Sequence, residues 1–114
     1  MEVTVLIDKL THQPELVEFS EVIETIDAAY HFSPTAFTNG ETVNEANQNN
    51  GSCKIFAFAK LNDLTEQQAL ACFGDFYRKD VLQNPDNVDH QNIRNFIRFG
   101  WQGIQFTGEA LTAK

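Results

Sequence analysis

"SCKIFAFAKLND", residues 52–63, determines whether the middle of the chain is a helix or a strand. In a strand, Cys53, Ile55 and Leu61 share one face with two Ala, but the other face then mixes two Phe with two Lys. In a helix, Ser52 caps the N-terminus, the Ile and Phe residues form a broad apolar face, and both Lys lie outside it. A helix also satisfies its own backbone hydrogen bonds without a partner strand. The sequence therefore favours a helix here, with the strand as the alternative.

The chain before this segment is also expected to be helical. From Pro14 to Tyr30 apolar residues recur at steps of three and four, which places them on one face of a helix. Pro14 suits the first turn, where its missing N–H costs nothing. The predicted apolar face comprises Leu16, Phe19, Ile23, Ile26 and Tyr30. Residues 2–10 fit a helix or a strand, and we expect a helix because no later segment offers an obvious partner strand.

A further helix is expected to start at Thr65. Its hydroxyl can cap the backbone while Gln68 reaches back, which is the pattern of a capping box. The apolar spacing continues to Val81, and Asn84-Pro85 ends the helix.

The last predicted helix has Asp89 as its N-cap and runs to Trp101. Val88 and Ile93 are placed to form a hydrophobic staple across its first turn. Gly100 and Gly103 then disfavour continuation of the helix, and residues 103–107 allow one short extended segment.

Residues 38–51, "TNGETVNEANQNNG", have the composition of an irregular loop. A connection of this length inside a small domain is usually either functional or disordered. The sequence thus predicts a mostly α protein, a compact helical fold with one domain over residues 1–114 and an Asn-rich loop at about 38–51.

Charge and composition exclude several classes of partner. Sixteen acidic and eight basic residues give a net charge of −8, which repels nucleic acid and anionic lipid surfaces. No stretch approaches the roughly 18 apolar residues that a membrane span needs, and the first residues do not resemble a secretory signal. The two Cys lack zinc-site spacing, the three His lack metal-ligand spacing, and no phosphate-binding motif is present. We therefore expect no metal, no cofactor and a location in the bacterial cytoplasm.

One catalytic hypothesis fits the sequence. Cys53 near the start of a helix could form a thiolate, with His90 as its base. The alternative is that Cys53 is a small core residue and His90 a solvated one. The second interpretation is favoured, so an enzyme is the less favoured function.

Amide side chains suggest a binding function instead, because each offers both a donor and an acceptor. If the Asn-rich loop folds over the start of the last helix, its side chains line a polar cleft between residues 38–52 and 89–101. The partner would be a protein or a small polar ligand. The alternative is an ordinary solvated loop. Candidate binding residues are Asn39, Asn44, Glu45, Gln48, Ser52, Lys54, Asn92, Arg94 and Asn95.

Several long strings carry a family resemblance: "SPTAFTNG" (33–40), "NNGSCKIFAFA" (49–59), "ALACFGDFYRKDVL" (69–82), "DHQNIRNFI" (89–97) and "GIQFTGEAL" (103–111). They resemble the HopJ type III effector family. The resemblance implies a protein secreted into a host cell by a type III apparatus, with a host protein as a further partner. It implies no enzymatic activity, cofactor or catalytic residue.

Overall fold

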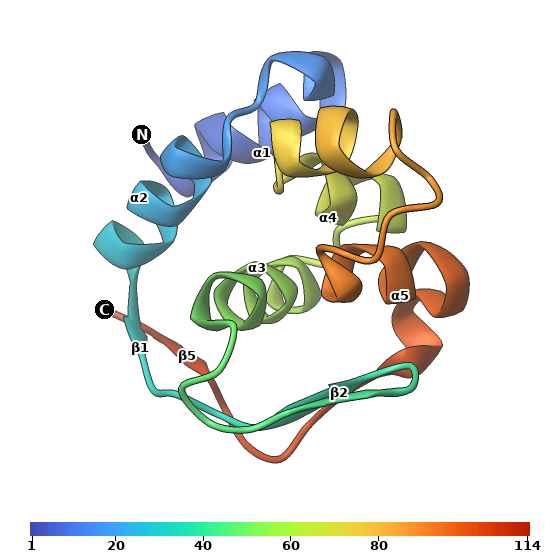
Figure 1. The fold of residues 1–114 in the computed structure, drawn as a ribbon. Coiled ribbons are helices and arrows are strands. Elements are labelled where there is room, and N and C mark those ends of the chain that lie inside the picture. Colours follow the sequence, from blue (N-terminus) through green and yellow to red (C-terminus); the bar gives the residue numbers. More distant parts are fainter.

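The structure is a computed structural model that describes residues 1–114. Five α-helices, three shorter helical turns and five three-residue strands make up the fold (Figure 1). The α-helices are α1 (Val3–His12), α2 (Phe19–Ala29), α3 (Asn50–Leu61), α4 (Glu66–Ala71) and α5 (Gln91–Phe99). The turns are η1 (Pro14–Leu16), η2 (Phe76–Val81, a π-helix) and η3 (Gly100–Gly103). The strands are β1 (Tyr30–Phe32), β2 (Phe37–Asn39), β3 (Thr42–Asn44), β4 (Ile104–Phe106) and β5 (Leu111–Ala113).

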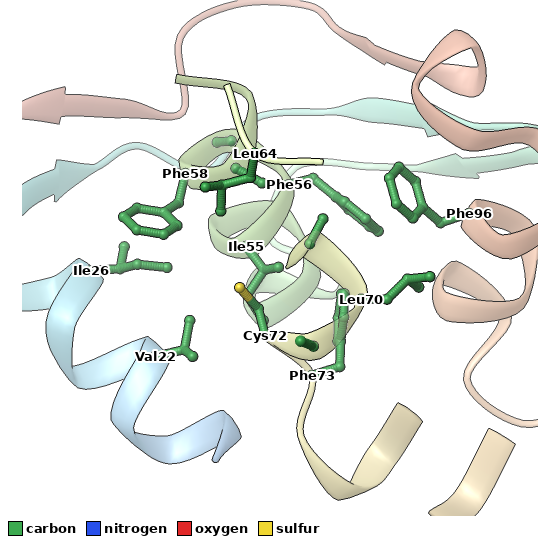
Figure 2. Packing of buried hydrophobic residues seen from close by; sticks show 14 of the residues in the cluster. Val22, Ile26, Ile55, Phe56, Phe58, Leu64, Leu70, Cys72, Phe73 and Phe96 are labelled. Carbon is green, nitrogen blue, oxygen red and sulfur yellow. The ribbon is translucent and has the colours of Figure 1, made fainter. Parts of the chain in front are cut away.

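Helix α3 lies in the middle of the molecule with the other elements around it (Figure 1), so residues 52–61 are helical as the sequence favours. Figure 2 shows Phe56 directed toward Phe96 and Phe58 directed toward Ile26. The Phe56 and Phe96 ring centroids lie 4.9 Å apart. Both Phe of α3 are fully buried within a cluster of 24 buried residues. Burial on several sides explains why the α3 sequence carries so few polar residues.

The start of α3 differs from the prediction. The helix begins at Asn50, and Asn49 is its N-cap in the left-handed conformation with φ 52°. Ser52 is therefore in the first turn and does not cap the helix. The sequence misplaced the start because Asn tolerates the left-handed conformation and can begin a helix without a side-chain cap.

The prediction of a mostly α fold is wrong, because the chain also forms two antiparallel sheets. β1 pairs with β5, and β2 lies between β3 and β4. The hairpin β2–β3 occupies part of the segment expected to be an irregular loop. Its two-residue turn has Gly40 first, with φ 60°, and Glu41 second, as in a type II′ turn. Strands of three residues whose partners lie up to about eighty positions away leave no local signal in the sequence.

Helix α1 confirms the expected helix near the N-terminus, but the single helix predicted from Pro14 to Tyr30 is wrong. The chain turns out of the helical conformation at Val17, whose ψ is 132° and whose side chain is fully buried. Arg78 donates hydrogen bonds to the carbonyls of Pro14 and Val17 at 3.2 and 2.7 Å. Because of this break, Leu16 is 54% exposed instead of lying on the buried face. The distant Arg78 that stabilises the break could not be assigned from the local spacing.

The capping box of α4 is confirmed. Gln68 N–H donates to the Thr65 hydroxyl at 3.1 Å, and Thr65 N–H donates to the Gln68 amide oxygen at 2.9 Å. The continuation of this helix to Val81 is wrong, because α4 ends at Ala71. Gly74 has φ 60°, and a Cβ there would lie 2.8 Å from the backbone nitrogen of Phe19. Gly74 therefore ends the helix and lets the start of α2 approach closely.

The N-terminus of the last helix is also shifted by one residue. His90, in the left-handed conformation with φ 52°, is the N-cap, and Asp89 is not. Asp89 accepts a hydrogen bond from Arg94 at 2.7 Å instead. Val88 is 81% exposed, so the expected staple to Ile93 does not form. The helix ends at Phe99, and Trp101 lies in η3.

Candidate functional site

A cavity of about 350 Å³ lies where the N-termini of α3 and α5 meet strand β3. We call it the polar cleft. Phe19, Phe73 and Phe76 give it an apolar side, and the remaining lining residues are Thr42, Asn49, Gly51, Ser52, His90, Gln91, Asn92 and Ile93. The cavity thus has walls from both segments between which the sequence places a cleft.

Backbone donors with no acceptor in the protein lie at both helix starts. In α3 the first intrahelical N–H donor is that of Cys53, which bonds to the Asn49 carbonyl. In α5 the corresponding donor is Ile93, which bonds to the His90 carbonyl. Neither N-cap side chain makes a capping hydrogen bond. The preceding N–H groups at each start are the orphan donors of a helix N-terminus, and they are available to an acceptor in the cleft.

His90 adds an oriented imidazole to the cleft. Its Nε2 lies 3.0 Å from the Asp80 carboxylate, and its ring packs on Phe76 with centroids 5.1 Å apart. The bond to Asp80 places a proton on Nε2 and leaves Nδ1 without a partner in the protein. The cleft therefore combines backbone donors, one free imidazole nitrogen and an aromatic wall.

Four of the Asn residues form a network beside the cleft. Asn39 Nδ2 donates to the Asn92 carbonyl at 2.7 Å and to Asn92 Oδ1 at 3.1 Å. Asn44 and Asn92 exchange two amide hydrogen bonds, each 3.0 Å long, and Asn49 donates to Asn44 Oδ1 at 2.7 Å. Asn39, Asn44 and Asn92 are buried. The structure brings these predicted residues together, but they fix the β2–β3 hairpin to α5, and of the three only Asn92 lines the cleft.

Asn95 extends the same connection, because its amide donates to the Thr42 hydroxyl. Asn39 Oδ1 is buried without a hydrogen-bond partner. The hairpin and α5 are thus joined by side chains from β2, β3 and α5, which holds one wall of the cleft in place.

Four other predicted binding residues lie away from the cleft lining. Gln48 accepts from the Glu45 backbone N–H at 3.1 Å, which closes an exposed turn. Lys54 pairs with Asp27 of α2 at 2.8 Å. Arg94 holds the loop before α5 through the Asp89 carboxylate and the Pro85 and Asn84 carbonyls. The hydrogen bond from Arg94 lowers the pKa of the Asp89 carboxyl below its usual range.

The structure does not assemble Cys53 and His90 as a catalytic pair. Cys53 is 1% exposed, and its thiol donates to the Thr35 carbonyl at 3.5 Å, whereas His90 pairs with Asp80. Burial raises the pKa of the Cys53 thiol, which is opposite to what a nucleophilic thiolate needs. The other Cys, Cys72, is also a free buried thiol, and burial raises its pKa to about 12.

Sequence reasoning missed the aromatic wall of the polar cleft. Phe19 was assigned to the face of a longer helix, and nothing in its local pattern places it beside Gly51. The glycine at position 51 was the one local signal of this contact. A Cβ there would lie 3.0 Å from the Phe19 ring. A Gly just inside a helix start is consistent with such a close approach.

Comparison with known proteins assigns the chain to a family. The model of a family described as HopJ type III effector protein matches residues 3–111. The chain belongs to this HopJ family. The crystal structure of VPA0580, described as a protein of unknown function, is similar over 100% of this chain and 95% of its own, with a TM-score of 0.99 and 58% sequence identity. No curated protein matches this HopJ family member.

Two structural findings complete the description of this HopJ protein. None of its helices has both the length and the apolar character needed to cross a membrane. No group of three or more His, Cys, Asp or Glu side chains is arranged to hold a metal ion.

Proposed function

We propose that this HopJ family member is a small binding or regulatory protein and that the polar cleft receives its ligand. One observation carries the proposal: residues from two helix starts that carry unpaired N–H groups line the same cavity as His90, whose Nδ1 has no partner in the protein. Concave sites with an apolar lining and a few convergent polar groups are the usual form of small-molecule sites.

The lining restricts the chemistry of the ligand. Orphan N–H groups at helix starts favour an acceptor oxygen, and the two helix dipoles favour one that carries negative charge. The rings of Phe19, Phe73 and Phe76 suit an apolar group next to that oxygen. A volume of about 350 Å³ is at the lower end of the range for ligand sites, so the ligand is small. A carboxylate or primary amide attached to an apolar group meets these conditions.

The Asn network supports binding indirectly. A site whose walls are already fixed loses less entropy when its ligand binds. Asn92 lines the cleft and is held by amides from both strands of the hairpin. The wall formed by α5 is therefore set before a ligand arrives.

A pair of matched fragments tests the proposal. Benzoate and benzamide share a ring and differ in charge, and each is titrated into the ¹⁵N-labelled protein while amide resonances are followed. We expect Ser52, Gln91 and Asn92 to shift, with benzoate stronger if the helix dipoles dominate. Gln91→Trp places a bulky ring at an exposed lining position and should abolish the shifts. Gln102→Trp, at an exposed position in η3, is the matched control and should preserve them. Shifts confined to other surfaces, or none at millimolar fragment, would contradict the proposed site.

The cysteine enzyme is not supported by a comparable observation. Its nucleophile would have to be the thiol of Cys53, which is buried, has a raised pKa and donates to a backbone carbonyl.

Family membership favours a second proposal, which concerns location. We propose translocation into a host cell by type III secretion, because the family is described as a type III effector. The full chain, fused to a reporter that is active only in host cytosol, should give a signal from a secretion-competent strain. A strain without the apparatus is the control, and equal signals from both strains would reject translocation.

A further inference from the structure

One edge of the β-structure has no partner. β4 and β5 belong to one run of chain that follows β1 and β2 in the antiparallel direction (Figure 1). Between the ladders, Thr107 N–H donates to the Ala36 carbonyl at 3.1 Å and Ser33 N–H donates to the Ala110 carbonyl at 2.8 Å. No strand pairs with the opposite side of β4 or β5.

The register shows which backbone groups face that open edge. In an antiparallel ladder, alternate residues direct both N–H and C=O to the same neighbour. The Ser33 to Ala110 bond and the bond from Lys114 N–H to the Ala29 carbonyl identify Thr112 as the residue that faces β1. Leu111 and Ala113 therefore direct their N–H and C=O groups away from β1. By the same alternation in β4, Phe106 directs its groups away from β2.

A groove borders this edge. One cavity of about 720 Å³ lies between Ala57, Lys60 and Leu61 of α3 and the segment that includes Phe106 and β5. A second cavity of about 290 Å³ is also lined by Lys60 and lies toward Trp101 and Ile104. Together the two cavities follow the β4–β5 segment, and α3 forms the facing wall.

We propose that this groove binds an extended segment of a second protein, which adds a strand to the open edge of β5. Ala113 is exposed, and its unpaired N–H and C=O groups match a peptide backbone, as in β-strand addition. Leu111 is 5% exposed, so Ala113 is the accessible residue of this edge. Seven of the eleven residues that line the larger cavity are hydrophobic, which suits apolar side chains at every second position of the segment.

Charge selects the partner. Lys60, Asp63 and Glu109 are the charged residues that line the groove, and none of them forms an ion pair. They leave one negative charge in the groove, within a chain of net charge −8. Pairing between two copies of this edge would bring together two chains that each carry a net charge of −8, and charge repulsion opposes that. The occupant is therefore a neutral-to-basic segment with alternating apolar residues.

The test uses a synthetic peptide and NMR. The probe is Ac-Lys-Val-Thr-Val-Lys-Val-Thr-NH₂, added to the ¹⁵N-labelled full chain. We expect the amides of Leu111 and Ala113 to shift and the hydrogen exchange of the exposed Ala113 amide to slow by at least about tenfold, as for an amide that gains a cooperative ladder bond. The same peptide with every backbone amide N-methylated keeps its side chains but cannot donate to the edge, and it should not bind. Equal binding of the methylated peptide would overturn strand addition. A Glu-for-Lys peptide that binds as tightly as the probe would overturn the charge assignment.

Two proline variants of the protein give a matched comparison. Ala113→Pro removes an N–H that faces the open edge, and Pro is tolerated on that side of an edge strand. We expect about fivefold weaker peptide binding and unchanged stability. Thr112→Pro removes the N–H that faces β1 and should destabilise the protein instead. Unchanged peptide affinity in Ala113→Pro would overturn the proposal. So would dimerisation of the free protein with the same shifts, because the occupant would then be a second copy. Neither result depends on whether the polar cleft binds benzoate or benzamide.

Discussion

Replacing Asn92 with Ala should cost about 3 kcal/mol of unfolding free energy, because its amide is the centre of the buried Asn network. The side chain accepts from Asn39 at 3.1 Å and from Asn44 at 3.0 Å, and donates to Asn44 at 3.0 Å. Asn39 keeps its bond to the Asn92 carbonyl, so that donor remains satisfied. The Asn44 amide N–H group loses its acceptor while the residue stays 1% exposed. The unsatisfied Asn44 donor costs about 2 kcal/mol. The lost bond from Asn92 to Asn44 Oδ1, an acceptor that keeps its bond from Asn49, adds about 1 kcal/mol.

Urea unfolding followed by Trp101 fluorescence measures this loss. The indole packs against Phe96 of α5 with ring centroids 5.0 Å apart, so the signal reports on the helix that carries Asn92. At a slope of about 1.5 kcal/mol per molar urea, the expected midpoint drops by about 2 M. Gln91→Ala, an exposed change on the same helix, should stay within about 0.5 kcal/mol of the parent.

The reasoning is refuted if Asn92→Ala lowers the unfolding free energy by less than about 1 kcal/mol while the urea dependence of that free energy stays unchanged. The amides would then be satisfied by water once Asn92 is gone, and the network would not be what holds the hairpin to α5. A double-mutant cycle with Asn44→Ala separates the cases. If the two residues act through their mutual bonds, the double variant is more stable than the sum of the single losses implies.

Three further predictions concern the breaks in the helices and the buried thiols. Gly74→Ala should cost at least about 2 kcal/mol in the same urea assay, because it adds a positive-φ penalty to a clash with the Phe19 backbone. Gly108→Ala is its control, because a Cβ there would lie 4.0 Å from Thr35 Cγ2, an ordinary contact, and equal losses would refute the reasoning. Arg78→Leu should cost about 2 kcal/mol, because it removes charge-assisted bonds to the Pro14 and Val17 carbonyls, and a loss within error would contradict that role. Burial raises the pKa of Cys72 from 9.0 to about 12, so above pH 9 the unfolded chain releases a proton that the folded chain retains, and stability falls by up to about 1.4 kcal/mol per pH unit. Cys72→Ala should show a correspondingly shallower decline in unfolding experiments between pH 9 and 11, and parallel curves would contradict it.

Local signals in the sequence were sufficient for the elements whose stabilising contacts are local. The capping box of Thr65 and Gln68 lies within four residues of chain, and it forms as the pattern indicates. Helix α3 could likewise be predicted, because its apolar residues and the absence of a partner strand both favour a helix. These features depend on near neighbours and are therefore readable from one sequence.

The features that sequence reasoning missed depend on distant contacts. The break at Val17 is stabilised by Arg78, and the break at Gly74 by the approach of Phe19. Each strand has three residues, too few to show a periodicity that could be recognised, and β1, β2, β4 and β5 have partners far away in the chain. In the candidate site, the abundance of Asn in residues 38–51 indicated a polar cluster. It could not show which amides bond to each other and which line a cavity.

The network and the cleft share Asn92, and this has a consequence for binding. The Asn92 amide group holds the hairpin, while its residue also lines the cavity at the start of α5. A ligand that bonds to the backbone N–H groups there does not compete with the side-chain bonds, because the two use different atoms. Binding and hairpin attachment can therefore reinforce each other: fixing α5 lowers the entropy that the site loses when a ligand binds, and a bound ligand stabilises the folded state by mass action. The stability lost in an Asn92 variant should accordingly be accompanied by weaker binding in the cleft, even though no ligand atom needs to touch the Asn92 side chain.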